Sequence, residues 1–353
     1  MGLGRRTVGA PWRGGDGTVT SDDRSADDWA GRTVLITGSN GFLGGRLARA
    51  LCLRSARVLG LMLPGTNPML NGGDVRGELG MEPMFGDIRD IATLAAIFRD
   101  HEVAVVFHMA AFASPVRAHD DPWLAFEVNA RGTWNLLEAA RTAAVVPRVV
   151  LASTDSVYGE SDGSPFTETM QIAPNFPYEA SKACAEIAAH CYVATFGLQV
   201  AIARFCNIYG PGDLTQTRLI VSTIQAALSG RPQVLRGDGS AMRNYLYVDD
   251  AVAALLGFAE ALGRAEFAGR VINFCDETPY SVLDIVSRVL DQTGQPDLAP
   301  ILGASKPGEI SIKLASAAKA RQLLNWQPAI TLDEGLRRTI AWHRERQSRV
   351  EGA

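Results

Sequence analysis

Short apolar runs alternate with helical apolar patterns through the first two thirds of the chain. The runs are rich in β-branched residues, which predicts buried strands near 33–37, 57–63, 103–108, 148–153 and 199–205. Between them, apolar residues recur every three or four positions, which predicts helices near 42–53, 91–99, 122–143 and 178–195. This alternation is typical of a parallel sheet covered by helices on both faces. We therefore predict an α/β fold with a doubly wound, Rossmann-type parallel sheet.

The same pattern divides the chain into three parts. Residues 1–30 are rich in Gly, Asp, Ser and Arg and lack apolar periodicity, so we predict a disordered tail. The alternating pattern covers 31–205, which we predict to be the Rossmann domain. After residue 205, loops rich in Gly and Pro interrupt the alternation. The last predicted element is an amphipathic helix near 332–346. We predict that 206–348 forms a smaller substrate-binding part, partly interleaved with the first.

Composition excludes several classes of function. The chain has 353 residues, of which 47% are hydrophobic, so it can bury a large core. A formal charge of −4 gives no electrostatic reason to expect nucleic acid, and no apolar run reaches the length of a membrane span. The five cysteines show no metal-binding spacing and are expected to be small buried residues in a reducing compartment. We expect a cytoplasmic protein that binds no metal, no nucleic acid and no membrane.

A glycine-rich turn joins the first predicted strand to the first helix. Gly38, Gly41 and Gly44 have G-x-x-G-x-x-G spacing. Glycines in such a turn let the backbone approach a pyrophosphate, and the helix N-terminus attracts its negative charge. The next strand ends at Met62 and Leu63, without an acid for the adenosine ribose and without an arginine for a 2′-phosphate. Because no cation stands there, we expect NAD rather than NADP.

Tyr178 and Lys182 stand one helical turn apart on a predicted helix. The chain has only four lysines and seven tyrosines, so this pairing is uncommon on composition alone. A nearby ammonium stabilises a phenolate, so a group with an ordinary pKa of about 10 can act as a base near neutral pH. The spacing predicts a tyrosine that accepts a proton and whose pKa is lowered by the lysine.

These motifs and several others in the same order resemble the extended short-chain dehydrogenase/reductase family, the NAD-dependent nucleotide-sugar epimerases and dehydratases. The resemblance covers about 31–346. The further matching motifs are Gly86-Asp87, His108-x-Ala-Ala111, Asn129-x-x-Gly-Thr133, Ser153-Thr154-x-x-Val157-Tyr158-Gly159, Arg204-x-x-Asn207-x-Tyr-Gly-Pro-Gly and Arg243-Asn-Tyr-x-Tyr-Val-Asp249-Asp250.

The resemblance implies a role for each matching residue. Tyr178 is implied to be the catalytic base, Thr154 its proton relay, and Lys182 the residue that binds the nicotinamide ribose and lowers the tyrosine pKa. Asp155 is a further catalytic candidate. The implied cofactor is NAD, held by Gly38, Asn40, Gly41, Phe42, Leu43, Gly44, Asp87, Ile88, Ala110, Ala111, Tyr178 and Lys182.

The substrate implied by the resemblance is a nucleotide-diphosphate sugar. Its implied contacts are Ser114, Thr154, Asn207, Arg218 and Arg243. Arginine suits a diphosphate because its guanidinium donates bidentate hydrogen bonds. In this family the helices that match 122–143 and 178–195 pair across a two-fold axis, which implies a homodimer.

Two reactions of this family start with oxidation at C4 of the sugar. A 4-epimerase returns the hydride to the other face of the 4-ketone, whereas a 4,6-dehydratase also needs an acid for the C6 hydroxyl and a base for the C5 proton. Dehydratases resemble Thr-Asp-Glu, or Thr-Asp-Lys in the CDP-glucose enzymes, where this chain has Thr154-Asp155-Ser156. Serine is a poor base, so a 4-epimerase is favoured.

A CDP-glucose-like 4,6-dehydratase is the alternative, because Asp155 and the stretch 207–220 resemble that branch. A non-enzymatic dinucleotide sensor is a remote alternative. The Tyr178–Lys182 pair argues against it, since such sensors often lack that pair.

Overall fold

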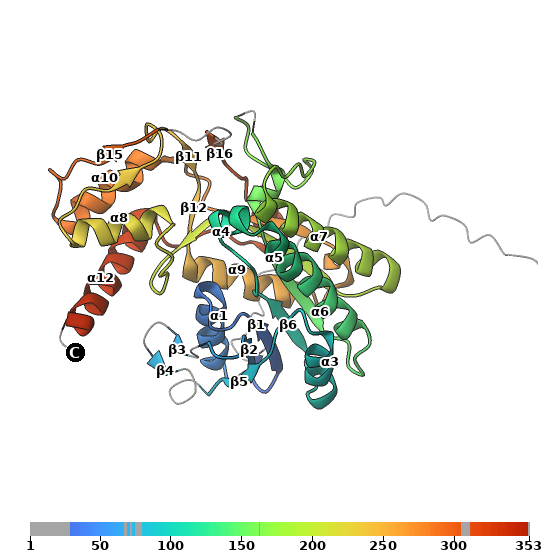
Figure 1. Cartoon of the computed structure of the whole chain (residues 1–353). Coiled ribbons are helices and arrows are strands. Elements are labelled where there is room, and N and C mark those ends of the chain that lie inside the picture. Colours follow the sequence, from blue (N-terminus) through green and yellow to red (C-terminus); the bar gives the residue numbers. More distant parts are fainter. Residues whose placement is uncertain are drawn as a thin grey trace, which may run out of the picture.

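The computed structural model describes residues 29–66, 69–70, 73–74, 80–161, 163–304 and 311–351. Within these ranges a seven-stranded sheet forms the centre of the molecule, in the order β13–β8–β7–β6–β1–β2–β5 (Figure 1). Every neighbouring pair in it is parallel. Its strands are β1 (Thr33–Thr37), β2 (Arg57–Met62), β5 (Glu82–Phe85), β6 (Val105–His108), β7 (Arg148–Thr154), β8 (Val200–Phe205) and β13 (Val271–Phe274). The predicted Rossmann-type α/β fold is confirmed.

The strand order places a crevice beside β1. From β1 the chain adds β2 and β5 on one side, and then returns to add β6, β7, β8 and β13 on the other. Ligands of such sheets bind at this reversal, outside the carboxyl ends of the strands. Thr37 and His108 end β1 and β6 side by side, and Thr37 Oγ1 lies 2.7 Å from His108 Nδ1. The glycine turn that follows Thr37 therefore opens directly into the crevice.

Helices cover both faces of the sheet because each carries an apolar stripe toward it. On one face lie α1 (Phe42–Cys52) and α9 (Val248–Ala261), and on the other lie α3 (Ile91–Asp100), α6 (Gly132–Arg141) and α7 (Pro177–Phe196) (Figure 1). The first apolar layer includes Leu47 and Phe258, and the second includes Leu94 and Leu136. Burial of this apolar area drives the folding of both layers.

The helix predicted at 122–143 is interrupted in the structure. It consists of α5 (Pro122–Phe126), a π-helical turn (Glu127–Arg131) and α6. The buried Asn129 lies in the π turn, where its side chain accepts from Phe112 N at 2.7 Å and donates to Ser181 Oγ at 2.9 Å. The apolar periodicity of the sequence did not reveal this interruption, because the turn serves polar contacts to a loop and to α7.

The C-terminal part packs around a third apolar cluster that includes Ile224, Ile285, Val289 and Leu336. Its helices are α8 (Leu219–Leu228), α10 (Val282–Thr293) and α12 (Leu332–Glu351). Its described short strands form three small sheets, β9 (Asn207–Tyr209) with β12 (Tyr245–Tyr247), β10 (Val234–Leu235) with β15 (Ile301–Leu302), and β14 (Tyr280–Ser281) with β11 (Met242–Arg243) and β16 (Ile312–Lys313).

The remaining elements are short. They are β3 (Met69–Leu70), β4 (Gly73–Asp74), α4 (Pro115–Asp120), α11 (Ala318–Leu324) and the 3-10 helices η3 (Asp155–Tyr158) and η4 (Ala265–Phe267).

Of the predicted tail, 1–30, only residues 29 and 30 lie within the described part of the chain. Trp29 is buried, its ring centroid lies 5.9 Å from that of Phe107, and its Nε1 donates to Glu260 Oε1 at 2.9 Å. The predicted tail therefore extends too far, because Trp29 belongs to the core beneath β6. No helix in the described ranges is long and apolar enough to cross a membrane.

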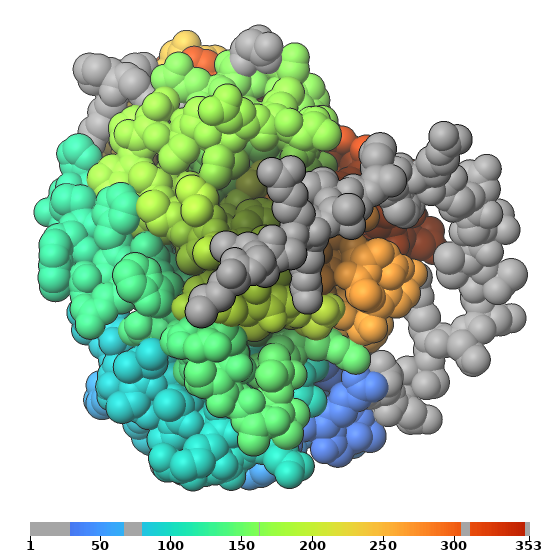
Figure 2. All heavy atoms as spheres, turned by 90° about the vertical axis from the view of Figure 1, so that its right-hand side faces the viewer, coloured from blue at the N-terminus to red at the C-terminus, as the bar shows by residue number. Residues whose placement is uncertain are grey.

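The outer helical layer exposes several large apolar side chains. Trp123, Trp134 and Ile187, from α5, α6 and α7, are among the most exposed large apolar residues that are described. The outer face of these helices is turned toward the viewer in Figure 2. Cys184 and Cys191 on α7 are also exposed, contrary to the expectation of buried cysteines, whereas Cys206 and Cys275 are buried.

Candidate functional site

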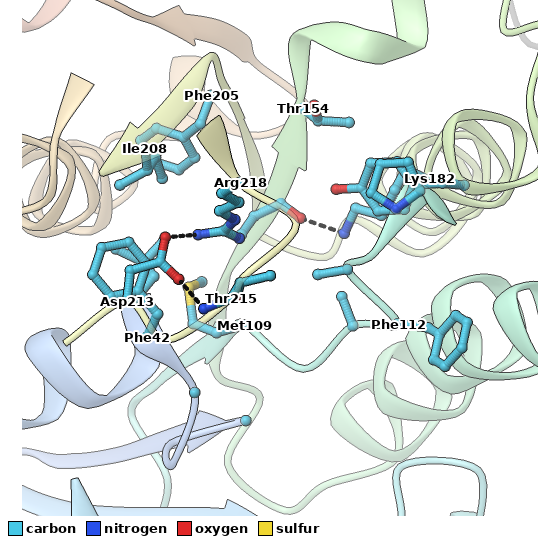
Figure 3. A pocket seen from close by; sticks show the side chains of 18 of the residues that line it. Phe42, Met109, Phe112, Thr154, Lys182, Phe205, Ile208, Asp213, Thr215 and Arg218 are labelled. Carbon is cyan, nitrogen blue, oxygen red and sulfur yellow. Dashed lines mark hydrogen bonds and ion pairs between the residues drawn. The ribbon is translucent and has the colours of Figure 1, made fainter. Parts of the chain in front are cut away.

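A cavity of about 920 Å³ runs along the carboxyl ends of the sheet strands and beneath the C-terminal part (Figure 3). The glycine turn lines one end of it, and Tyr178 and Lys182 line it further along. Residues of β9, β11 and β16 line its C-terminal side. The cavity therefore joins the predicted dinucleotide site to the predicted substrate site.

The glycine turn has no room for side chains. Gly38 has a φ of +69°, and a Cβ there would lie 2.8 Å from Ala110 Cα. A Cβ on Gly44 would overlap the Gly38 carbonyl oxygen. The N-terminus of α1 has no side-chain cap, so its first N–H groups remain able to bind a pyrophosphate. This tight, uncapped turn fits a dinucleotide, and Gly38, Asn40, Gly41, Phe42, Leu43 and Gly44 all line the cavity.

The other predicted cofactor residues also lie along this half of the cavity. Asp87, Ile88, Ala110 and Ala111 line it, together with Met62 and Leu63 at the end of β2. Arg89, which no sequence motif indicated, also lines the cavity and pairs with Asp87 at 2.6 Å. The Arg89 guanidinium holds the pKa of the Asp87 carboxyl below its usual value.

Tyr178, Lys182 and Thr154 come together where α7 begins beside the end of β7. Figure 3 shows Thr154 at the end of its strand and Lys182 near it. Lys182 Nζ donates to the Ala152 carbonyl at 2.5 Å, and burial lowers the pKa of Lys182 to about 8. Burial raises the pKa of Tyr178 to about 12, and the Arg218 charge and the Thr154 hydroxyl offset this only in part.

The predicted lowering of the Tyr178 pKa by Lys182 is therefore not seen in the protein alone. Desolvation of the phenol outweighs the favourable charges, and the lysine directs a hydrogen bond to a backbone carbonyl.

A second polar cluster, formed by Asp155, Ser156 and Lys313, adjoins Thr154. Thr154 Oγ1 accepts from Ser156 N and donates to Ser156 Oγ, both at 3.2 Å. Lys313, from β16, donates from Nζ to Ser156 Oγ at 2.8 Å, and its Nζ lies 3.1 Å from Asp155 Oδ1. Ser156 and Lys313 line the cavity, whereas the buried Asp155 is not one of the described residues that line it.

Lys313 lies 157 positions after Ser156 and outside the motifs predicted from the sequence. A signal was present in the composition, because lysine is scarce in this chain and Lys313 is one of only four.

Three of the predicted substrate residues line the C-terminal side of the cavity, namely Asn207, Arg218 and Arg243. Arg218 pairs with the buried Asp213 at 2.8 Å, and its guanidinium carbon lies 5.7 Å from the centroid of the Phe42 ring (Figure 3). Arg218 therefore bridges the substrate side and the glycine turn. Arg243 Nη1 donates to the Met242 carbonyl at 2.8 Å, so backbone oxygens hold its guanidinium in place.

Ser114 is placed differently from the other predicted substrate residues. It is not among the described residues that line the cavity, and its Oγ accepts from Arg117 N at 3.3 Å, which caps α4. Its predicted contact with substrate stays a prediction. Arg117 and Arg236 line the cavity and were not anticipated. In the described part of the chain, no three His, Cys, Asp or Glu side chains gather as a metal site would require.

Comparison with known proteins identifies relatives over most of the chain. The NAD dependent epimerase/dehydratase family matches residues 34–274. A UDP-glucuronate 4-epimerase of Thermodesulfobacterium geofontis is 30% identical over 323 residues, covering 88% of this chain and 96% of the relative. A dTDP-glucose 4,6-dehydratase of Xanthomonas campestris pv. campestris is 31% identical over 336 residues, covering 91% and 95%.

A solved structure shares the fold over most of this chain. It is a double mutant of the dTDP-glucose 4,6-dehydratase DesIV of Streptomyces venezuelae with NAD bound. It matches with a TM-score of 0.80 and 29% identity, covering 89% of this chain and 98% of the other. The relatives thus include both epimerases and dehydratases.

Proposed function

The chain belongs to the NAD dependent epimerase/dehydratase family, and we propose that it is a nucleotide-sugar 4-epimerase. NAD is its cofactor, and the uncapped glycine turn is the part of the cavity that fits the NAD pyrophosphate. The observation that carries the proposal is the meeting of Tyr178, Thr154 and Lys182 in the cavity that also contains this turn. A base and a hydride acceptor that flank one sugar carbon can oxidise it.

Tyr178, Thr154 and Lys182 have different roles in this oxidation. Tyr178 takes the proton of the C4 hydroxyl, which Thr154 Oγ1 helps to hold, while the C4 hydrogen leaves as hydride. Lys182 holds the nicotinamide ribose. When bound, oxidised NAD accepts the hydride and brings a positive charge into the cavity, which favours the phenolate form of Tyr178. Return of the hydride to the opposite face of C4, with return of the proton from Tyr178 to O4, would give the C4 epimer.

The placement of Asp155 supports epimerisation over dehydration. A dehydratase would use this carboxyl to protonate the C6 hydroxyl, but here Asp155 is buried, is not among the described residues that line the cavity, and pairs with Lys313. An epimerase needs neither an acid nor a base beyond Tyr178 and Thr154.

A 4,6-dehydratase is the second candidate, and one observation favours it. The Lys313 ammonium lies against Ser156, so an amine occupies the region where the CDP-glucose enzymes are expected to place the lysine of their Thr-Asp-Lys strand end. A relative named as a dTDP-glucose 4,6-dehydratase is as similar to this chain as the epimerase relative is.

The fate of the C4 hydrogen distinguishes the two reactions. We would incubate the NAD-loaded protein with a panel of nucleotide sugars deuterated at C4, without an external reductant, and locate the deuterium by NMR. An epimerase returns the label to C4 of the epimer, which is the outcome we expect. Label at C6 of a 4-keto-6-deoxy sugar would instead establish the second candidate, and no turnover of any nucleotide sugar would contradict both.

A further inference from the structure

The Lys313 ammonium is fixed at the wall of the cavity. Its Nζ donates to Ser156 Oγ at 2.8 Å and lies 3.1 Å from Asp155 Oδ1. Asp155 is only 2% exposed, and a carboxylate buried to this degree is stable only with a partner that compensates its charge. Asp155 therefore holds the Lys313 head group in place before any ligand arrives.

One N–H group of Lys313 remains for a ligand. An ammonium carries three N–H donors, and among the described residues Ser156 and Asp155 take two of them. Lys313 lines the cavity, with its side chain 12% exposed, so the third donor can reach a group inside it. A charged donor in a largely desolvated place gains free energy when it finds an acceptor.

The strand register shows which part of a substrate would pass Lys313. β16 pairs in parallel with β11, with Lys313 directly beside Arg243, the expected diphosphate ligand. On the other side, Ser156 Oγ, which Lys313 contacts, lies 3.2 Å from Thr154 Oγ1, the proposed contact of the C4 hydroxyl. A sugar that reaches from the diphosphate to Thr154 therefore passes along Lys313.

The use of lysine at this position supports a role in binding a hydroxyl. The chain has 34 cationic side chains but only four lysines, and two of these, Lys182 and Lys313, line this one cavity. An arginine fork matches planar carboxylates and diphosphates, whereas a compact ammonium can direct single hydrogen bonds to three separate oxygens. Asp155, Ser156 and a sugar hydroxyl are three such acceptors.

We propose that Lys313 contacts the substrate directly, donating its third N–H to a sugar hydroxyl next to C4, either O3 or O6. Lys313 thereby determines specificity for that hydroxyl, and Asp155 and Ser156 are its positioning residues. The proposal rests on the proposed function for the place of the sugar, and it holds for an epimerase and for a dehydratase alike.

Binding measurements on the NAD-loaded protein test this contact. We would compare the wild type, Lys313→Met and the double variant Lys313→Met/Asp155→Asn, which removes both buried charges and so protects the fold. The ligands are UDP-glucose, its 3-deoxy and 6-deoxy analogues and free UDP, with the dTDP series measured in parallel. Lys319→Met is the matched control, since Lys319 donates to the Val271 carbonyl at 2.8 Å and is not among the described residues that line the cavity.

We expect both Lys313 variants to bind the glucose nucleotide about tenfold or more weakly than the wild type, and free nucleotide within about twofold of it. For the one deoxy analogue that lacks the contacted hydroxyl, the variants and the wild type should bind equally. Equal losses for the glucose nucleotide and both analogues, or a loss for free nucleotide as well, would overturn the proposal. Binding without turnover would contradict the proposed function and leave this result valid.

Discussion

Replacing Tyr178 by Phe removes one oxygen atom and tests the assignment of the base. The ring keeps its place at the start of α7. The Thr154 hydroxyl retains its hydrogen bonds to Asp155 and Ser156, so no buried partner is left without one. We therefore expect the free energy of unfolding to change by less than about 1 kcal/mol.

The expected loss of rate follows from the role of the phenol. A positioned general base contributes about 10²- to 10⁴-fold, so Tyr178→Phe should slow oxidation by at least about a hundredfold. The pKa of Tyr178, about 12 in the protein alone, also sets a pH dependence. Since only the phenolate accepts a proton, kcat/KM of the wild type should rise with pH up to the lower pKa that bound NAD imposes. The residual rate of the variant should lack this rise.

The assay is the transient absorbance of NADH at about 340 nm after NAD-loaded protein meets a nucleotide sugar. Tyr158→Phe is the matched control, since the Tyr158 hydroxyl donates to Asn273 at 2.9 Å and Tyr158 is not among the described residues that line the cavity. It should lose about 1–3 kcal/mol of stability, because the buried Asn273 Oδ1 loses this donor, and little rate. A Tyr178→Phe protein that still reduces bound NAD within a few-fold of the wild type would refute the assignment, and its NAD content should equal that of the wild type.

Three further outcomes are expected. NAD should bind more tightly than NADP in a fluorescence titration, because the end of β2 lacks a cation and Arg89 is held in an ion pair with Asp87. A preference for NADP would mean that Arg89 leaves Asp87 and binds the 2′-phosphate. Light scattering should give twice the 37.8 kDa chain mass, because Trp123 and Trp134 are 68% and 56% exposed on the outer helices and a second copy would cover them. A monomer at micromolar concentration would contradict this. The free energy of unfolding should fall as pH rises from 10 to 12, because burial raises the pKa of Tyr158 and Tyr245 to about 12 and these tyrosines therefore ionise first in the unfolded chain. The loss should reach up to about 2–3 kcal/mol per tyrosine. Denaturant unfolding curves that do not change over this pH range would contradict the prediction.

The sequence by itself determined five strands of the sheet, several of the helices that cover it and one end of the site, whereas β13 and α9 were not predicted. Strands buried on both faces must be continuous apolar runs, so β1, β6 and β7 could be predicted from composition and length. The glycine turn and the Tyr178–Lys182 pair could be predicted too, because each depends on residues within a few positions of one another. Local spacing is enough to define such motifs.

Tertiary structure alone decided what depends on distant residues and on burial. Lys313 reaches Ser156 from β16, a two-residue strand whose sequence carries no periodicity to predict it. The π turn at Asn129 follows from contacts to a loop and to α7, which no helical pattern records. The pKa of Tyr178 rises because packing removes water from the phenol, and this desolvation outweighs the charges that favour its ionisation. These features required the fold, because the groups that interact are brought together only when the chain is packed.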